Sequence, residues 1–553
     1  MRKHIFVAAA VVVLALLSFA VFPSHTYLFA DTQIYAPILE RLWNPSLLGH
    51  DLLATQPHVA FTIHDEVALA ARWLTGAGFR EILAVEQFLF RALEIWGVML
   101  IAMALGLSAR MSALVAGIFA LGAWVWGPIV LTVEVEPIPR GFAVPLILLA
   151  IGLASHGRDL AAGLAVGLAF LYHPPAVFPY WLAYFCLTLW PSKPEVMRRR
   201  ILGLLPLAGS VLILLVLSRL QVGASERQAL LGRIQPWLET VQRLRGPYNW
   251  ISIWGSQWIW HYLVLWAISI AAYWRIRRSV PFDLRFFLLG LPLVGILSMP
   301  VSYLLLEKLK IALIPQFQPM RALLFVTAFV LVCAAVAGIR AAQEKRFPES
   351  LLWFLVVFSL PLEFKVTQLL FPFPAEVLQR HRLVLLILLA ALATLAAWSE
   401  PRWRRLSLLP WCAAVLLPFW LLPAYGRVKF FTPPESPELT ALADWAKDAT
   451  PTDAVFLFPD ARYGLGPGVF RATALRAVYV DWKSGGQVNY LQHFSREWWT
   501  RWQTTMAPRF NPARTPDYSA LGIDYLIVQP SHGLPKATPV YQNRGFLVYR
   551  VKR

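Results

Sequence analysis

Long apolar runs separated by short polar segments dominate the chain up to about residue 424. The first run, 5–22, follows the basic stretch Met1-Arg2-Lys3-His4. Because a run of this length spans a bilayer and basic ends stay in the cytoplasm, the pattern predicts a retained signal anchor with its N-terminus inside. Further spans are expected at 84–106, 112–131, 141–154, 160–172, 175–190, 201–219, 256–274, 286–305, 320–340, 349–363, 383–398 and 406–424, about 13 transmembrane helices in all.

Between the first two spans, residues 23–82 form an outer loop that is too polar to cross the membrane. Apolar residues from Ile34 to Trp43 recur at helical spacing, which predicts an amphipathic helix on the membrane surface that ends at Asn44-Pro45. A second amphipathic helix is expected over about 65–74. Residues 1–424, including this loop, are therefore interpreted as one transmembrane domain.

From residue 425 onward the composition becomes that of a soluble domain. A helix over 438–447 and strands over 454–458, 525–528 and 545–549 predict a small α/β domain, 425–553. Tight basic clusters such as Arg198-Arg199-Arg200 fall in the predicted inner loops, so an odd number of spans leaves the C-terminus outside. The fold class is a polytopic α-helical membrane protein with an extracytoplasmic α/β domain.

Composition agrees with this interpretation and excludes several classes of function. Of 553 residues, 58% are hydrophobic and 15% are charged, so the chain is far more apolar than a soluble globular protein. The net charge of +19 does not indicate nucleic-acid binding, because Lys and Arg are spread over short loops as topology determinants. The three cysteines lie in apolar runs without metal-ligand spacing. Without a Walker loop or a His-Glu-x-x-His motif, ATP-driven transport and zinc proteolysis are not expected.

Acidic residues gather on the predicted outer face. Asp31 directly follows the first span, and Glu134 and Glu136 lie in the second outer loop. Two converging carboxylates could deprotonate a hydroxyl or hold a divalent metal, Mg or Mn, so these three are candidate catalytic residues. The alternatives are that Asp31 caps the helix that follows it and that the glutamates are simply solvated.

Arginines recur where spans enter the membrane from outside. Arg140, Arg321, Arg380 and Arg382 each stand at the start of a predicted descending helix, where the helix dipole opposes a cation. This placement suggests that they hold a lipid phosphate or pyrophosphate. The alternative is contact with ordinary membrane lipid headgroups or pairing with the nearby glutamates.

Other polar residues are candidates to line the same outer cavity, namely Tyr35, Asp51, Glu86 and His173. Glu86 lies near the outer end of the second span, and structural pairing within the membrane is the alternative for it. His173, between two short spans in Leu171-Tyr172-His173-Pro174-Pro175, could equally be satisfied by packing.

The order of these features resembles the C superfamily of membrane glycosyltransferases. The shared features are a first span, an acid at the start of a long outer loop, amphipathic surface helices, many spans and a C-terminal extracytoplasmic α/β domain. Asp31 matches the first acid of the family motif, and the motif position here reads Asp31-Thr32-Gln33, without the second acid. Glu134-Val135-Glu136-Pro137-Ile138-Pro139-Arg140, Leu171-Tyr172-His173-Pro174 and Tyr479-Val480-Asp481-Trp482-Lys483 are similar to stretches of uncharacterised bacterial members.

The resemblance implies an enzyme of the bacterial cytoplasmic (inner) membrane that takes a sugar from a polyprenyl-phosphate donor to a glycan, lipid or protein acceptor. Asp31 would activate or orient the acceptor, Glu134 or Glu136 would support it, and the arginines would hold the donor phosphate. Arginines that bind the donor phosphate without a metal ion would suit a site that lacks the second acid. That missing acid also favours the alternative of a catalytically silent scaffold for envelope assembly. A lipid-linked saccharide transporter is the third hypothesis.

Overall fold

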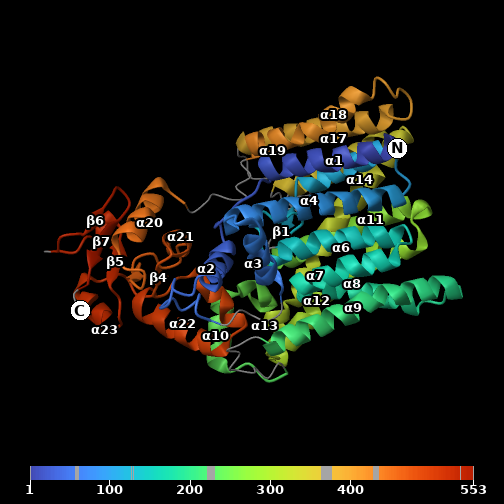
Figure 1. Ribbon diagram of the computed structural model, residues 1–553. Helices are drawn as coiled ribbons and strands as arrows, with labels where there is room; N and C mark the ends of the chain where they lie inside the picture. Colours follow the sequence, from blue (N-terminus) through green and yellow to red (C-terminus); the bar gives the residue numbers. More distant parts are fainter. Residues whose placement is uncertain are drawn as a thin grey trace.

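The computed structural model of the protein is mostly helical, with a long helical bundle at one end and a small β-sheet at the other (Figure 1). It describes residues 2–56, 62–125, 127–128, 130–220, 231–362, 377–426, 435–535 and 537–551. The N-terminus lies at the far end of the bundle and the C-terminus lies beside the sheet.

The helices of the bundle coincide with the predicted apolar runs. They are α1 (Arg2–Ala20), α4 (Phe79–Ala104), α5 (Ala109–Ala120), α6 (Pro139–Ser155), α7 (Asp159–Tyr172), α8 (Pro174–Leu189), α9 (Pro194–Leu220), α11 (Ser256–Ile276), α12 (Phe282–Ser302), α14 (Leu324–Gln343), α15 (Phe347–Ser359), α17 (Val377–Ser399), α18 (Leu408–Leu416) and α19 (Pro418–Gly426). Nearly every side chain of α14 is buried, so this helix forms the centre of the bundle.

Within the described residues, five helical segments are both long and apolar enough to cross a membrane: 79–104, 194–217, 282–308, 314–343 and 381–399. Other apolar helices, among them α5, α6 and α7, are shorter. The protein therefore has the apolar helices of a multi-pass membrane protein, and the number of about 13 spans stays a prediction.

Two of the predicted spans differ from the structure. The run 112–131 is helical only to Ala120, after which Gly122 adopts φ +73° and the chain forms the antiparallel hairpin β1 (Trp124–Val125) and β2 (Val130–Leu131). A left-handed glycine ends a helix whatever the hydropathy of the residues beyond it. The run 406–424 is divided into α18 and α19 at Pro418, because proline lacks the N–H that would continue the helix.

The first outer loop contains the two helices expected there. The first, α2 (Thr32–Trp43), buries residues such as Ile34, Ile38 and Leu39 and ends at Asn44. The second, α3 (His64–Thr75), has Asp65 and Glu66 in its first turn. Figure 1 shows α2 between the bundle and the sheet.

The C-terminal part contains a five-stranded sheet of order β4-β3-β5-β7-β6. Its strands are β3 (Val455–Leu457), β4 (Ala477–Val478), β5 (Tyr525–Val528), β6 (Tyr541–Gln542) and β7 (Leu547–Arg550). The first three are parallel and β7 runs antiparallel to both neighbours. Its helices are α20 (Pro437–Ala449), α21 (Gly466–Ala474), α22 (Gln492–Thr505) and α23 (Thr515–Ala520). The predicted helix 438–447 and the three predicted strands are thereby confirmed.

The sheet and the first outer loop share their hydrophobic cores. Ile34 and Ile38 of α2 pack in one cluster with Val480 and Trp498, and Ala36 packs in another with residues of α20 and α21. Burial on this scale fixes α2 against the C-terminal part. The loop that follows the first span is thus placed directly beside residues more than 400 positions away.

Candidate active site

The N-terminus of α2 is capped by Glu136 and not by Asp31. The Glu136 carboxylate accepts hydrogen bonds from the backbone N–H groups of Ala30 (2.8 Å) and Asp31 (2.7 Å), and from the N–H and hydroxyl of Thr32. Asp31 stands at the N-cap position, but its side chain makes no capping hydrogen bond. An anion at a helix N-terminus satisfies the otherwise unpaired N–H groups. Glu136 of the second outer loop therefore caps α2, and the Asp31 side chain makes a different contact.

That contact is an ion pair with Lys483 of the C-terminal part. Lys483 Nζ lies 2.5 Å from Asp31 Oδ1. Burial opposes the charge on Asp31, but Lys483, Arg140 and Arg245 together lower the pKa of its carboxyl below the ordinary value. Since 37% of the Asp31 side-chain surface stays accessible, against 16% for Lys483, the carboxylate can still be reached by a ligand.

Around this pair lies a set of buried and half-buried polar side chains from distant parts of the sequence. We call it the Asp31 cluster; its members are Asp31, Tyr35, Glu134, Glu136, Arg140, Arg245, Tyr248, Lys483 and Tyr490. Asp31 interacts electrostatically with the two arginines and with each of the three tyrosines. Burial, together with the charge of Asp31, raises the pKa of Tyr35 well above the ordinary value, so this phenol stays protonated and can donate a hydrogen bond.

Two arginines of the Asp31 cluster have very different partners. Arg140 donates from Nε (3.0 Å) and Nη2 (2.6 Å) to Glu134 Oε2, so part of its charge is already paired. Arg245, the last residue of α10 (Pro236–Arg245), lies with its guanidinium 3.8 Å from the centre of the Trp482 ring. Burial lowers the pKa of Arg245 to about 10, which still leaves it cationic at neutral pH.

Arg321 joins the edge of the Asp31 cluster. It donates to the side-chain oxygen of Gln318, whose amide nitrogen lies 3.4 Å from the hydroxyl of Tyr490. Its guanidinium also faces the ring of Tyr248 at 5.7 Å. The Nη1 atom is buried and has no hydrogen-bond partner among the described residues. A buried guanidinium nitrogen without a partner has spare capacity for an anionic ligand.

Asp51, expected in the cavity, is instead a buried structural residue. Its oxygens accept from the backbone N–H groups of Leu53, Ala54 and Val478, and its side chain is fully buried. Arg471 lies 3.8 Å from Asp51 and 2.6 Å from Asp481. This triad joins the outer loop to the C-terminal part, and its three side chains are at most 1% exposed.

The remaining predicted residues are placed as follows. The Tyr172 hydroxyl donates to Glu86 at 2.5 Å, so Glu86 has a structural partner. His173 caps α8 by accepting from the Ala176 N–H, and burial with the nearby charge of Arg140 lowers its pKa to about 3. The Arg380 side chain lies outside the described residues, and the role of Arg382, half-buried near the start of α17, stays a prediction.

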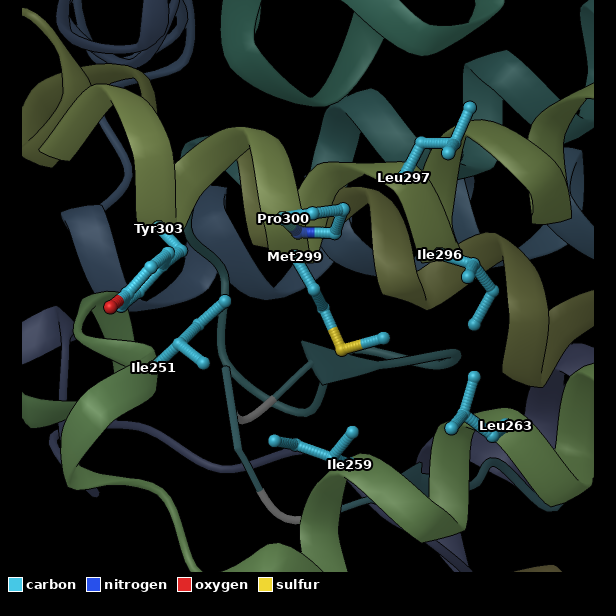
Figure 2. A pocket seen from close by; sticks show the side chains of 8 residues that line it. All are labelled: Ile251, Ile259, Leu263, Ile296, Leu297, Met299, Pro300 and Tyr303. Atoms are coloured by element: carbon cyan, nitrogen blue, oxygen red, sulfur yellow. The ribbon is translucent and has the colours of Figure 1, made fainter. Parts of the chain in front are cut away.

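An apolar groove opens at the same end of the bundle. Its volume is about 430 Å³, and it is lined by Ile251, Ile259, Leu263, Ile296, Leu297, Met299, Pro300 and Tyr303 (Figure 2). These side chains come from α11, from the end of α12 and the segment Tyr303–Lys308 that follows it, and from the short turn at 251–253. Ile251 follows Tyr248 of the Asp31 cluster by three residues, so the chain connects the groove to the cluster.

Sequence reasoning did not find four of the partners of Asp31, which lie more than 200 positions further along the chain. Lys483, Arg245, Tyr248 and Tyr490 come from segments whose spacing gives no sign of a shared site. One signal was present, because Lys483 ends the stretch Tyr479-Val480-Asp481-Trp482-Lys483 that the family resemblance had already marked. Its proximity to Asp31 depends on tertiary packing alone.

Comparison with known proteins gives a partial family match and similar structures. Residues 437–505 match a domain of unknown function, DUF6798, and this segment contains Lys483. No curated protein matches the chain. The crystal structure of ArnT from Cupriavidus metallidurans in the apo state is similar at 14% identity with a TM-score of 0.49, over 99% of this chain and 97% of ArnT.

Two further solved structures are similar to the chain. ArnT bound to undecaprenyl phosphate gives a TM-score of 0.47 at 14% identity, over 99% of this chain and 97% of that one. The arabinofuranosyltransferase AftD from Mycobacteria gives 0.46 at 15% identity, over 99% of this chain but only 40% of AftD.

Proposed function

We propose that this protein is a membrane glycosyltransferase that moves a sugar from a polyprenyl-phosphate donor to a cell-envelope acceptor on the extracytoplasmic side. The observation that carries the proposal is the Asp31 cluster, where an accessible carboxylate is surrounded by cations and protonated tyrosines close to an apolar groove. A lipid-linked sugar phosphate has the matching parts, namely an apolar chain, an anionic phosphate and a polar sugar.

The chemistry requires a base and a positive environment. The acceptor hydroxyl gives its proton to Asp31 as its oxygen forms a bond to the anomeric carbon of the sugar. The bond between that carbon and the phosphate oxygen breaks, and the phosphate leaves as the polyprenyl phosphate monoester with one additional negative charge. Arg245 and Arg321 offset that charge, since each has a buried guanidinium nitrogen without a hydrogen-bond partner among the described residues.

The groove supports a role for the lipid chain. All its lining residues except Tyr303 have purely hydrocarbon or thioether side chains, and Lys308 lies 5.2 Å from the Tyr303 ring at its edge. An isoprenoid chain in this groove would be held by apolar contact alone, while its phosphate extends toward Tyr248 and Arg321. The donor would enter sideways from the bilayer.

Two observations favour a second candidate, a catalytically silent scaffold. Lys483 already occupies one oxygen of Asp31, and the family's second acid is absent. In a scaffold the pair would serve only to fix the C-terminal part onto the outer loop.

Transfer assays separate the two candidates. The purified chain in lipid nanodiscs is incubated with a panel of radiolabelled polyprenyl-phosphate sugars and envelope acceptor fractions. The proposal predicts release of polyprenyl phosphate with at least one donor, and a rate about 100- to 10,000-fold lower for Asp31→Asn. If no donor of this class is consumed by the wild type, the scaffold is the better description.

A further inference from the structure

Four of the six carboxylate oxygens of the Asp31 cluster already have hydrogen-bond or ion-pair partners. Both oxygens of Glu136 accept hydrogen bonds from the start of α2, Glu134 Oε2 accepts two from Arg140, and Asp31 Oδ1 is bound by Lys483. Mg²⁺ and Mn²⁺ need several free oxygen ligands. Within the described part of the chain, no group of three or more His, Cys, Asp or Glu side chains is placed to hold a metal. The residues present therefore do not fit the metal that the family layout suggested.

Lys483 supplies a cation directly beside Asp31. Its ammonium group contacts Asp31 at 2.5 Å and also interacts electrostatically with Glu136. A cation at this position offsets the repulsion between the two neighbouring carboxylates and favours the ionised form of Asp31. These are the electrostatic effects that a bound metal has on its acidic ligands.

The backbone around Lys483 is held by buried contacts. Asp481 pairs with Arg471 at 2.6 Å, accepts from the Ser484 N–H at 3.1 Å and receives the Trp498 indole N–H on its carbonyl oxygen at 2.9 Å. Trp482 is covered by the guanidinium of Arg245. Asp481 and Trp482, which directly precede Lys483, are thus fixed by buried contacts. Lys483 is therefore held beside Asp31 by a rigid segment and not by a loose surface loop.

We propose that Lys483 is a positioning residue that takes the place of a divalent metal ion beside Asp31, so that the C-terminal part completes the active site and transfer needs no added divalent metal. The claim about transfer activity rests on the proposed function. The claim that the site binds no divalent metal does not depend on that reaction.

The metal arm measures Mn²⁺ binding to the purified wild type by electron paramagnetic resonance. The inference predicts no stoichiometric binding of Mn²⁺ at micromolar concentration. Stoichiometric Mn²⁺ that is displaced by Mg²⁺ and lost in Asp31→Asn would overturn it, whether or not any sugar transfer is detected.

The activity arm compares wild type, Lys483→Gln and Lys483→Arg in the transfer assay with EDTA or Mn²⁺. Wild-type transfer is expected to be unchanged by EDTA. Lys483→Gln should be at least tenfold slower, with the acid limb of its pH–rate profile moved to higher pH, because Asp31 has lost its cation. Lys483→Arg, which keeps the charge, should recover most of the rate. Thermal unfolding of each variant verifies folding.

The outcomes of the activity arm separate this inference from the proposed function. Loss of wild-type transfer in EDTA with recovery in Mn²⁺ contradicts the inference and supports the glycosyltransferase. An unchanged rate and an unchanged acid limb in Lys483→Gln also contradict it. Absence of transfer in the wild type under all conditions contradicts the proposed function, and the Mn²⁺ measurement then decides the inference alone.

Discussion

Replacing Glu136 by Gln should loosen the start of α2 without emptying the space that the side chain fills. The glutamine oxygen can keep the bonds to Ala30 and Thr32, but its NH₂ group then faces the Asp31 N–H, which now bonds to Glu136 at 2.7 Å. One charge-assisted hydrogen bond is lost, about 1.5–3 kcal/mol. The favourable effect of an anion at a helix N-terminus, about 0.3–1 kcal/mol, is lost with it.

The expected loss in the free energy of local opening is therefore about 2–4 kcal/mol, which corresponds to about 30- to 700-fold faster amide exchange. Hydrogen–deuterium exchange with mass spectrometry, on peptides that cover residues 28–36 in nanodiscs, measures it directly. Glu134→Gln is the matched control, because Glu134 binds the Arg140 side chain through its carboxylate and caps no helix. Equal protection in Glu136→Gln and wild type, or equal loss in both variants, would refute the assigned role of Glu136.

Two further substitutions test other parts of the site. Arg471→Met leaves Asp51 and Asp481 buried without their cation and should lower the free energy of unfolding by about 3–5 kcal/mol in thermal or denaturant unfolding. The control is Arg476→Met, which should leave the contact with the outer loop intact because the hydrogen bonds of Arg476 stay within the C-terminal part. Equal protection of the outer loop from proteases in both variants would argue against the role of the triad. Because the pKa of His173 is lowered to about 3 from its ordinary 6.5, its contribution to stability is present above pH 6.5 and is lost as the pH falls from 6.5 toward 3. His173→Gln, which keeps a hydrogen-bond acceptor for the cap, should flatten the fall of Tm between pH 7 and pH 5, and an unchanged slope would contradict a neutral His173.

The helical layout was predictable because it depends on local composition. The apolar runs from α1 to α17 predicted nearly all the helices observed there, because an apolar run without helix-breaking residues has few alternatives to a helix in a bilayer. The two differences arose at single residues. Gly122 ends α5 through its backbone conformation and Pro418 divides the last run, and neither effect changes the mean hydropathy of its window.

The candidate site was predictable only in part. Asp31, Glu136 and Arg140 were found because they occur near the ends of spans that the topology brings to one face. The sequence left open whether Asp31 caps α2, and the structure assigns that cap to Glu136, 105 positions away. No local rule predicts such a partner, because the cap residue is normally sought at the helix start itself.

Lys483 illustrates the same limit more strongly. It lies 452 positions from Asp31, and the contact depends on the cores shared by α2 and the C-terminal sheet. Asp51 shows the reverse error. A conspicuous acid in an outer loop was expected in the cavity, but its oxygens are used by backbone N–H groups and by Arg471, so it joins two parts of the fold.

The central claim is that Asp31 activates the acceptor for attack on a lipid-phosphate sugar. The most direct measurement is the single-turnover rate of polyprenyl phosphate release by wild type and Asp31→Asn, with donor binding measured on the same preparations. The account predicts donor binding within about threefold in the two proteins, because binding rests on the arginines and the groove, and a release rate at least 100-fold lower in Asp31→Asn. Equal release rates would contradict it.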